Sequence, residues 1–135
     1  MKEKNFVLTF VRDKVDNRML YEHVHALTNE TRDMHPFAEL ADCSEVHDIS
    51  GFTESGVMFA ASLEHDRIPI KRDRLALLVP NPDYHELANR YKLISEYYRD
   101  DVKIFDEFQP AIDWLGLADL EGDINALRQQ ALQDA

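Results

Sequence analysis

Four residues that could bind a metal or act on a substrate lie close together in the sequence: Asp42, Cys43, His47 and Asp48. Thiolate, imidazole and carboxylate groups are the usual zinc ligands, and a Cys-x-x-x-His pair would supply half of a tetrahedral site. The spacing of the other histidines does not point to the second pair that a closed site needs. We therefore interpret the stretch as a solvated loop with one small buried thiol, and we expect no metal and no other cofactor.

Cys43 is the one cysteine of the chain. A cysteine nucleophile needs a base beside it, and no base can be assigned from the sequence. The chain has no G-x-S-x-G and no G-x-G-x-x-G motif, and its four glycines are few for a nucleotide-binding loop. These observations predict a protein that is not an enzyme. One cysteine excludes an internal disulfide and suits a reducing compartment, so we expect the protein in the cytoplasm.

A second candidate region is a loop of turn and cap residues, in which a partner would contact Ser50, Gly51, Thr53, Ser55 and Gly56. The loop opens a helix, whose first N–H groups and positive dipole end favour a phosphate on Ser55. The neighbouring Glu54 would repel that phosphate. In the simpler interpretation, which we favour, Thr53 caps the helix and Ser55 lies in its first turn.

A basic group stands out in an otherwise acidic chain, with Asp66 and Asp73 beside it; its members are Arg67, Lys71, Arg72 and Arg74. These cations could contact an anionic ligand or an acidic partner. Charges that flank an apolar strand more often act as gatekeepers against aggregation. The contact is therefore the less favoured of the two interpretations.

These residues must be positioned by strands and helices, and the clearest such element is the segment 74–80. It contains five consecutive apolar residues followed by a proline. Such a run is typical of a strand buried on both faces, at the centre of a parallel sheet. Asn81 can cap the element that follows, and Pro82 suits its first position because the missing N–H costs nothing there. A buried strand that leads directly into a helix indicates an α/β protein.

Strand and helix patterns alternate along the rest of the chain. Further strands are expected at residues 6–11, 37–41 and 102–105, and helices after Asp13 or Asp16 and after Gly56. Connections between parallel strands are nearly always right-handed. We therefore predict an α/β fold with a mostly parallel sheet of four to five strands and helices on both faces. The strand order does not follow from the sequence.

The helix after the central strand carries an apolar stripe made of Tyr84, Leu87, Ala88, Tyr91, Ile94 and Tyr98. The tyrosines of this stripe and four further aromatic residues could line a cavity for an apolar ligand. The four are Tyr97, Phe105, Phe108 and Trp114. Stripe spacing of this kind favours packing between helix and sheet, so we expect core residues first.

The last part of the chain indicates two helices. Pro110 begins a short one that Gly116 can end, and apolar residues then repeat at intervals of three and four as far as Ala131. We expect an α/β domain over residues 1–116 and, over residues 117–135, an appended C-terminal amphipathic helix that extends the same domain. Two heptads are too short to be stable alone. The stripe must therefore fold back on its own domain, which we favour, or pack on a second copy in a homodimer.

The net charge of −11 restricts the partners. An acidic surface repels phosphate backbones and anionic lipid headgroups, so we expect no binding to nucleic acid. No apolar run approaches the roughly 20 residues that cross a bilayer, and no integral membrane association is expected. The remaining candidates are a protein partner or a small apolar or anionic ligand.

The central strand with its Tyr-bearing helix, the strand 102–105 and the run Ala111-Ile112-Asp113-Trp114-Leu115 resemble a family of small bacterial stand-alone domains. These are described as STAS-like or anti-sigma-factor-antagonist-like, and they are related in fold to CRAL-TRIO lipid-transfer domains. The resemblance covers roughly residues 5–116. It implies a non-enzymatic binding module for protein interaction or regulation. The alternative is a carrier of a small apolar or lipid-like ligand in an aromatic-lined pocket.

The resemblance also bears on the loop at residues 50–56. In anti-sigma-factor antagonists a switch serine lies in an Asp-Ser-Ser/Thr-Gly stretch at a helix start. Ser55 and Gly56 match that stretch, whereas Thr53 stands in place of the aspartate and Glu54 in place of a serine. The match implies a regulatory switch at Ser55. Because Thr53 and Glu54 depart from the family's stretch, a kinase that recognises the usual sequence would meet a different sequence here.

Overall fold

The computed structural model describes residues 6–30, 37–51, 53, 55–56, 58–60, 62, 72–97 and 101–133. Its centre is a four-stranded sheet of β1 (Phe6–Asp16), β2 (Phe37–Gly51), β3 (Arg72–Leu78) and β4 (Val102–Phe105). The strands lie in the order β1-β2-β3-β4, and each neighbouring pair is parallel. The predicted α/β class with a parallel sheet is confirmed.

The apolar run of the sequence forms β3, which pairs with β2 on one side and β4 on the other. Leu75, Ala76 and Leu78 are buried, as expected of a strand covered on both faces. The turn after β3 also follows its local sequence. The Asn81 side chain accepts from the N–H of Asp83 at 3.0 Å, and Pro82 is the first residue of the short 3-10 helix η1 (Pro82–Tyr84).

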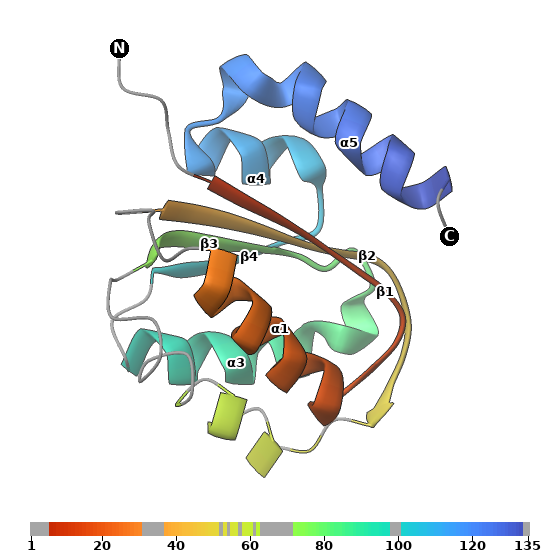
Figure 1. Cartoon of the computed structure of the whole chain (residues 1–135), viewed down its shortest axis with the longest axis vertical. Coiled ribbons are helices and arrows are strands. Elements are labelled where there is room, and N and C mark those ends of the chain that lie inside the picture. The colour runs from red at the N-terminus through yellow and green to blue at the C-terminus, as the bar shows by residue number, and fades with distance from the viewer. Residues whose placement is uncertain are drawn as a thin grey trace.

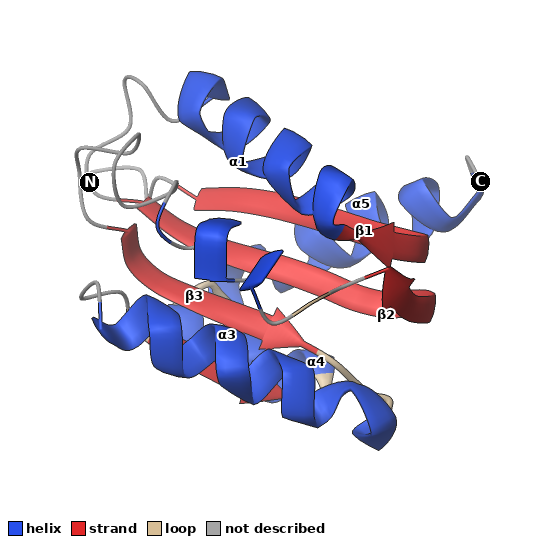
Figure 2. Cartoon of the chain, turned by 90° about the horizontal axis from the view of Figure 1, so that it is seen from below, coloured by secondary structure: helices blue, strands red, loops and turns tan. Residues whose placement is uncertain are grey.

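Helices cover both faces of the sheet (Figure 1). One face carries α1 (Asn17–Glu30) and α3 (His85–Tyr97), and the other carries α4 (Phe108–Leu115) and α5 (Glu121–Gln133). Seen from below, α1 and α3 lie roughly along the strands, with described residues of the segment 55–62 between the two helices (Figure 2). Strands added in one direction by right-handed connections place all their connecting helices on one face. The second face is therefore covered by the chain that continues after β4.

The first helix begins where the carboxylate of Asp16 accepts from the N–H of Met19 at 2.9 Å. Asp16 is thus the cap, whereas the alternative, Asp13, lies inside β1 with a φ of 61°. Both β1 and β2 are longer than the apolar pattern indicates, because their pairing continues through several register shifts to Asp16 and Gly51. The expectation of a loop at residues 42–48 is wrong, since these residues belong to β2.

The face under α4 and α5 holds the larger apolar core. Strand residues such as Leu40 and Leu78 pack there against Ile112 of α4, together with Leu117 and Ile124. Gly116, with a φ of 72°, ends α4 in the left-handed conformation that favours glycine, and the chain then reaches the short 3-10 helix η2 (Ala118–Leu120). Ile124 is fully buried, so α5 folds back on its own domain, although Leu127 is 48% exposed.

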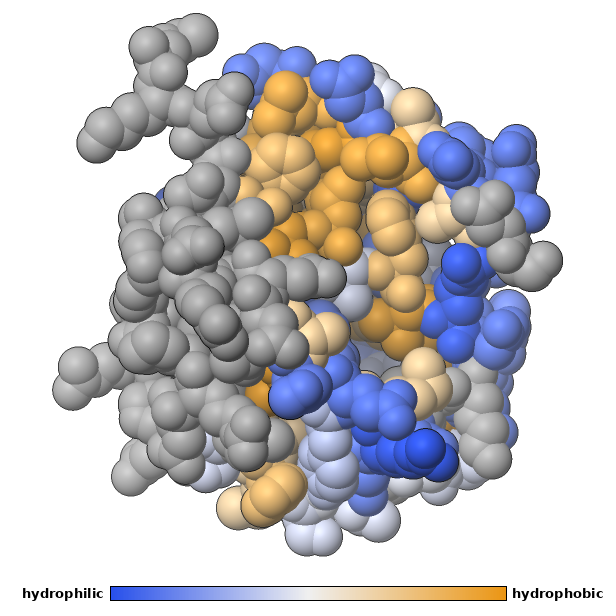
Figure 3. Space-filling view, in the orientation of Figure 1, coloured by the Kyte–Doolittle hydropathy of each residue, from blue (hydrophilic) through white to orange (hydrophobic). Residues whose placement is uncertain are grey.

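Apolar residues come to the surface in the upper middle of the view in Figure 3, with hydrophilic residues to the right of them and below. Within the described parts of the chain, no helix combines the length and the apolar character needed to cross a membrane.

Candidate functional site

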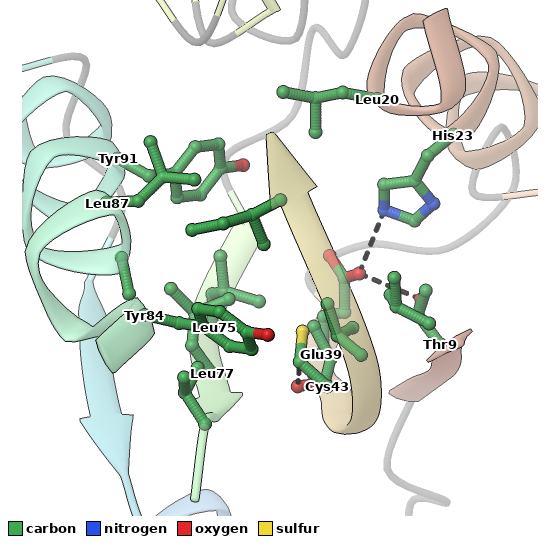
Figure 4. Close-up of a pocket in the computed structure, with 16 residues that line it drawn as sticks. Thr9, Leu20, His23, Glu39, Cys43, Leu75, Leu77, Tyr84, Leu87 and Tyr91 are labelled. Carbon is green, nitrogen blue, oxygen red and sulfur yellow. Dashed lines mark hydrogen bonds and ion pairs between the residues drawn. The ribbon is translucent and has the colours of Figure 1, made fainter. Parts of the chain in front are cut away.

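A pocket of about 150 Å³ lies between the sheet and the two helices α1 and α3 (Figure 4). Its floor is built from alternate residues of three neighbouring strands, because successive side chains of a strand point to opposite faces. These residues are Thr9 and Val11 of β1, Glu39, Ala41 and Cys43 of β2, and Leu75 and Leu77 of β3. Their neighbours Leu8, Leu40 and Leu78 belong to the core on the opposite face.

The walls come from the helices. Leu20 and His23 project from α1, and Tyr84, Leu87, Ala88 and Tyr91 come from η1 and α3. In Figure 4 the tyrosines lie on one side of the pocket, and His23 and Glu39 lie on the other. The first four residues of the apolar stripe therefore line a pocket. The side chains of Ile94 and Tyr97 and the whole of Tyr98 lie outside the described part of the structure.

The other aromatics of that proposed lining are placed elsewhere. Phe105, Phe108 and Trp114 belong to the core on the α4 and α5 face, where the rings of Phe105 and Trp114 lie 5.7 Å apart. These three residues follow the ordinary expectation that aromatics of a small α/β domain pack between helix and sheet.

One end of the pocket is polar and centres on Glu39, whose residue exposure is only 1%. One oxygen of its carboxylate, Oε2, accepts from the Thr9 hydroxyl at 2.9 Å and from the His23 ring Nε2 at 3.2 Å. A buried carboxylate needs such donors, because an uncompensated charge in an apolar site is costly. The polar end thus ties β1, β2 and α1 together through one carboxylate.

This arrangement differs from that of a hydrolytic triad. In a triad the histidine stands between the hydroxyl and the carboxylate, so that it can take the hydroxyl proton. Here the carboxylate stands between the hydroxyl of Thr9 and the ring of His23. The printed bonds thus join the hydroxyl to the carboxylate directly and not through the histidine.

The Cys43 thiol lines the same pocket. Burial, with smaller contributions from the carboxylates of Asp42 and Glu39, raises the pKa of Cys43 from its ordinary 9.0 to about 12. Because the thiolate is the reactive form, this cysteine is a poor nucleophile at neutral pH.

The cluster of metal-ligand types in the sequence is spread apart by the strand. Asp42 points away from the pocket and forms an ion pair with Arg128 of α5 at 2.6 Å, while the ring of His47 lies 3.9 Å from Glu45. Among the described residues no group of three or more His, Cys, Asp or Glu side chains is arranged to hold a metal.

The Asp42–Arg128 pair lies on the α4 and α5 face. Its two side chains are largely buried, and the guanidinium also stands 4.3 Å from the centre of the Phe108 ring. Sequence reasoning missed this pair, since 86 residues separate its members and neither stands in a recognisable motif.

The start of the helical segment after β2 follows its local sequence. The Thr53 hydroxyl accepts from the N–H of Gly56 at 3.0 Å, which is the bond of an N-cap. The Asn17 side chain bonds both the hydroxyl and the N–H of Thr53, and a Cβ on Gly56 would lie 2.2 Å from the Asn17 amide oxygen. Ser55 is exposed, with its hydroxyl 3.3 Å from that of Thr53.

The remaining loop residues end the strand. Ser50 and Gly51 are the last residues of β2, and the N–H of Ser50 donates to Asp48 at 2.8 Å. The loop candidates therefore lie beside the start of α1, at the carboxyl edge of the sheet.

The candidate anion contact falls largely outside the described structure. Arg67 and Lys71 lie outside the described residues, and Arg72 begins β3 with a side chain that is not described. The neighbouring Arg74 has a structural part, because its guanidinium donates to the carbonyl of Trp114 and stands 5.1 Å from the centre of that ring.

The fold and the pocket together define an α/β protein with an all-parallel four-stranded sheet and a hollow under one helical layer. Comparisons with protein-family models, with curated proteins and with solved structures gave no match to this chain.

Proposed function

We propose that this protein is a binding module for a small apolar molecule, which it holds in the pocket between the sheet, α1 and α3. The observation that carries the proposal is the pocket itself: about 150 Å³ of space beneath two tyrosines, walled almost entirely by hydrocarbon. Protein interiors are close-packed, and voids much larger than a water molecule are few. A hollow of this size is therefore a candidate for occupation by a ligand.

The size of the pocket limits the ligand. An apolar cavity of about 150 Å³ accepts a molecule the size of benzene. Apolar walls that lack partner atoms lose dispersion contacts, and an apolar ligand restores them. The ligand is thus a single ring or a short branched chain, or the end of a longer molecule whose remainder lies outside the pocket.

A binding role without catalysis is part of this proposal. The resemblance to STAS-like and CRAL-TRIO-related domains supports it, because that resemblance implies binding of partners or apolar ligands. The protonated thiol of Cys43 and the centrally placed carboxylate of Glu39 support it as well.

The test is a titration of the full chain with toluene, followed by two-dimensional NMR of the amide and methyl groups. We expect saturable shifts at pocket residues such as Ala41 and Leu87. The variant Ala88→Phe, which places a ring in the pocket, should lose these shifts. Ala126→Phe is the matched control, because Ala126 is an exposed helical alanine on α5 and its replacement should leave binding unchanged.

Two outcomes would overturn the proposal. One is the absence of saturable shifts in the wild-type protein, and the other is equal binding by the wild type and Ala88→Phe. Native mass spectrometry of the purified protein would add the identity of any ligand that copurifies with it.

A regulatory contact at Ser55 is a second candidate function. Its support is the exposure of Ser55 in the first turn after the Thr53 cap, together with the match to the switch serine of anti-sigma-factor antagonists. Intact-mass measurement of protein purified from its natural host should reveal a phosphorylated species that Ser55→Ala lacks. If wild-type protein carries no phosphate under any growth condition, this candidate is lost.

A further inference from the structure

A second, smaller cavity lies beside α5, at the second halves of β1 and β2. Its volume is about 30 Å³, and its lining includes Arg12 of β1, Asp42, Ser44 and Glu45 of β2, and Arg128 of α5. Two arginines and two acids therefore meet around a small space, in contrast to the apolar pocket under α1 and α3.

The backbone of β1 is irregular at this cavity. Successive side chains of a regular strand point to opposite faces, yet Phe10, Val11 and Arg12 all line the cavity. The register with β2 shifts between Phe10 and Arg12, and Asp13 follows with a φ of 61°. Irregularities of this kind re-aim side chains and cost energy, and they are frequent beside functional sites.

The guanidinium of Arg12 is incompletely bonded. Its Nη1 atom is buried and has no hydrogen-bond partner in the described part of the chain. A guanidinium stays charged in proteins and can only donate, so it cannot adapt by losing its proton. A buried N–H without an acceptor and a buried charge without a counter-ion are both unfavourable. An acceptor that carries a negative charge would relieve both.

The acids of the cavity are engaged with other groups. Asp42 accepts from Arg128 with one oxygen, and from the N–H and the hydroxyl of Ser44 with the other. The side chain of Glu45 is 44% exposed, and its carboxylate lies 3.9 Å from the ring of His47. The charge of Arg128 is thus balanced inside the protein, and the charge of the β1 arginine is left for another group.

We propose that this cavity binds a small carboxylate, whose oxygens accept from the Arg12 guanidinium. One water molecule needs about 10–15 Å³ of such space, so about 30 Å³ admits a group of two or three heavy atoms. That size fits a carboxylate and excludes phosphate and sulfate. The donors of a guanidinium also match the two oxygens of a carboxylate.

Charge separates a carboxylate from water and from other neutral acceptors. A neutral acceptor would satisfy the N–H of Arg12 but would leave the buried charge unbalanced. The net charge of −11 repels anions at long range, so binding depends on the local cation and should be lost with it. The cavity is separate from the pocket under α1 and α3, and the inference does not rest on the proposed function.

The experiment is an NMR titration of the full chain with sodium formate, which replaces sodium chloride at constant ionic strength. Formamide is the matched neutral probe, because it has the size and the carbonyl of formate without its charge. We expect saturable formate shifts at the amides of Ser44 and Ala131, which line the cavity, and at the Arg12 Nε–H. Formamide should bind at least about tenfold more weakly, since a charged acceptor makes the stronger hydrogen bond.

A variant tests the assigned contact. Arg12→Met keeps much of the length of the side chain and removes its charge, so the formate shifts should disappear. Arg18→Met is the matched control, because the Arg18 side chain on α1 is 87% exposed and its replacement should leave formate binding unchanged.

Three results would overturn the inference: no saturable formate shifts in the wild type, equal affinities for formate and formamide, or full formate binding in folded Arg12→Met. The two wild-type titrations and the Arg12 Nε–H shift decide the point even if Arg12→Met does not fold. Toluene binding tests the other pocket, so either proposal can fail while the other stands.

Discussion

The two faces of the sheet are built by the same strands but are packed differently. On the α4 and α5 face, alternate residues such as Leu40 and Leu78 meet Ile112 and Ile124 in a filled core. On the α1 and α3 face, the intervening residues such as Leu75 and Leu77 border a pocket of about 150 Å³. We refer to these as the filled face and the pocket face.

The polar groups differ in the same way. On the filled face the buried acid Asp42 is paired with an arginine, so the charges of the pair cancel. On the pocket face the buried acid Glu39 is held by a hydroxyl and an imidazole at one end of an apolar space. The filled face therefore stabilises the fold, and the pocket face is the one to which we assign the proposed binding. Each prediction below tests that division.

The largest expected effect separates two adjacent residues of β3. Leu78→Ala, on the filled face, should lower the free energy of unfolding by about 3 kcal/mol, because it opens a cavity in a close-packed core. Leu77→Ala, on the pocket face, should cost about 1.5 kcal/mol, because that side chain is only partly buried and its surroundings are already open. Urea denaturation of both variants measures the difference. Equal losses would show that the two faces are packed alike.

The next prediction concerns the ion pair of the filled face. Asp42→Ala leaves the largely buried Arg128 without its partner and should destabilise the protein by about 2 kcal/mol. Glu22→Ala is the control: it breaks the exposed Arg18–Glu22 pair of α1 and should change stability by less than about 0.5 kcal/mol. Thermal unfolding followed by circular dichroism measures both. The affinity for toluene should be the same in folded Asp42→Ala as in the wild type, and a loss of binding would mean that the two faces are coupled.

Larger side chains test the same division in the opposite direction. Ala111→Leu on α4 should destabilise the protein by about 1.5 kcal/mol, since Ala111 is fully buried in the filled core. Ala88→Leu on α3 should change stability by less than about 0.5 kcal/mol, because the added carbons enter the pocket. Both are alanine-to-leucine changes in helices, so helix propensity cancels in the comparison. A large loss in Ala88→Leu, measured in urea, would mean that the pocket is closed to added side-chain volume.

Features whose causes are local could be predicted from the sequence. The turn after β3 followed from Asn81 and Pro82, and the end of α4 followed from Gly116, because each of these residues favours one backbone conformation. β3 was recognised as a central strand by its apolar run, and β4 has the bounds that its pattern indicates. These elements fix the parallel arrangement and the position of the tyrosine stripe.

Features that depend on distant pairing could not be predicted. The residues 42–48 are polar enough to suggest a loop, yet they are held as a strand by pairing with β1 through register shifts. The bond between Thr9 and Glu39 depends on that pairing, and the place of His23 depends on how α1 crosses the sheet. One sign of the site was present: Glu39 is an acid at an inward position of an otherwise apolar strand segment.

The smallest expected effect is a pH dependence of stability that arises from the titration of Cys43. It reports whether water reaches the floor of the pocket. Because burial raises the pKa of Cys43 from 9.0 to about 12, the folded protein keeps the thiol proton between these values while the unfolded chain loses it. The unfolded state then binds fewer protons, so stability must fall as the pH rises through this range. Between pH 8 and pH 10 the loss should be about 1 kcal/mol.

The Cys43→Ala variant should lack this part of the alkaline loss in urea denaturation at the two pH values. An identical pH dependence in both proteins would mean that water reaches the Cys43 thiol. The floor of the pocket would then be hydrated, contrary to the apolar pocket face described above.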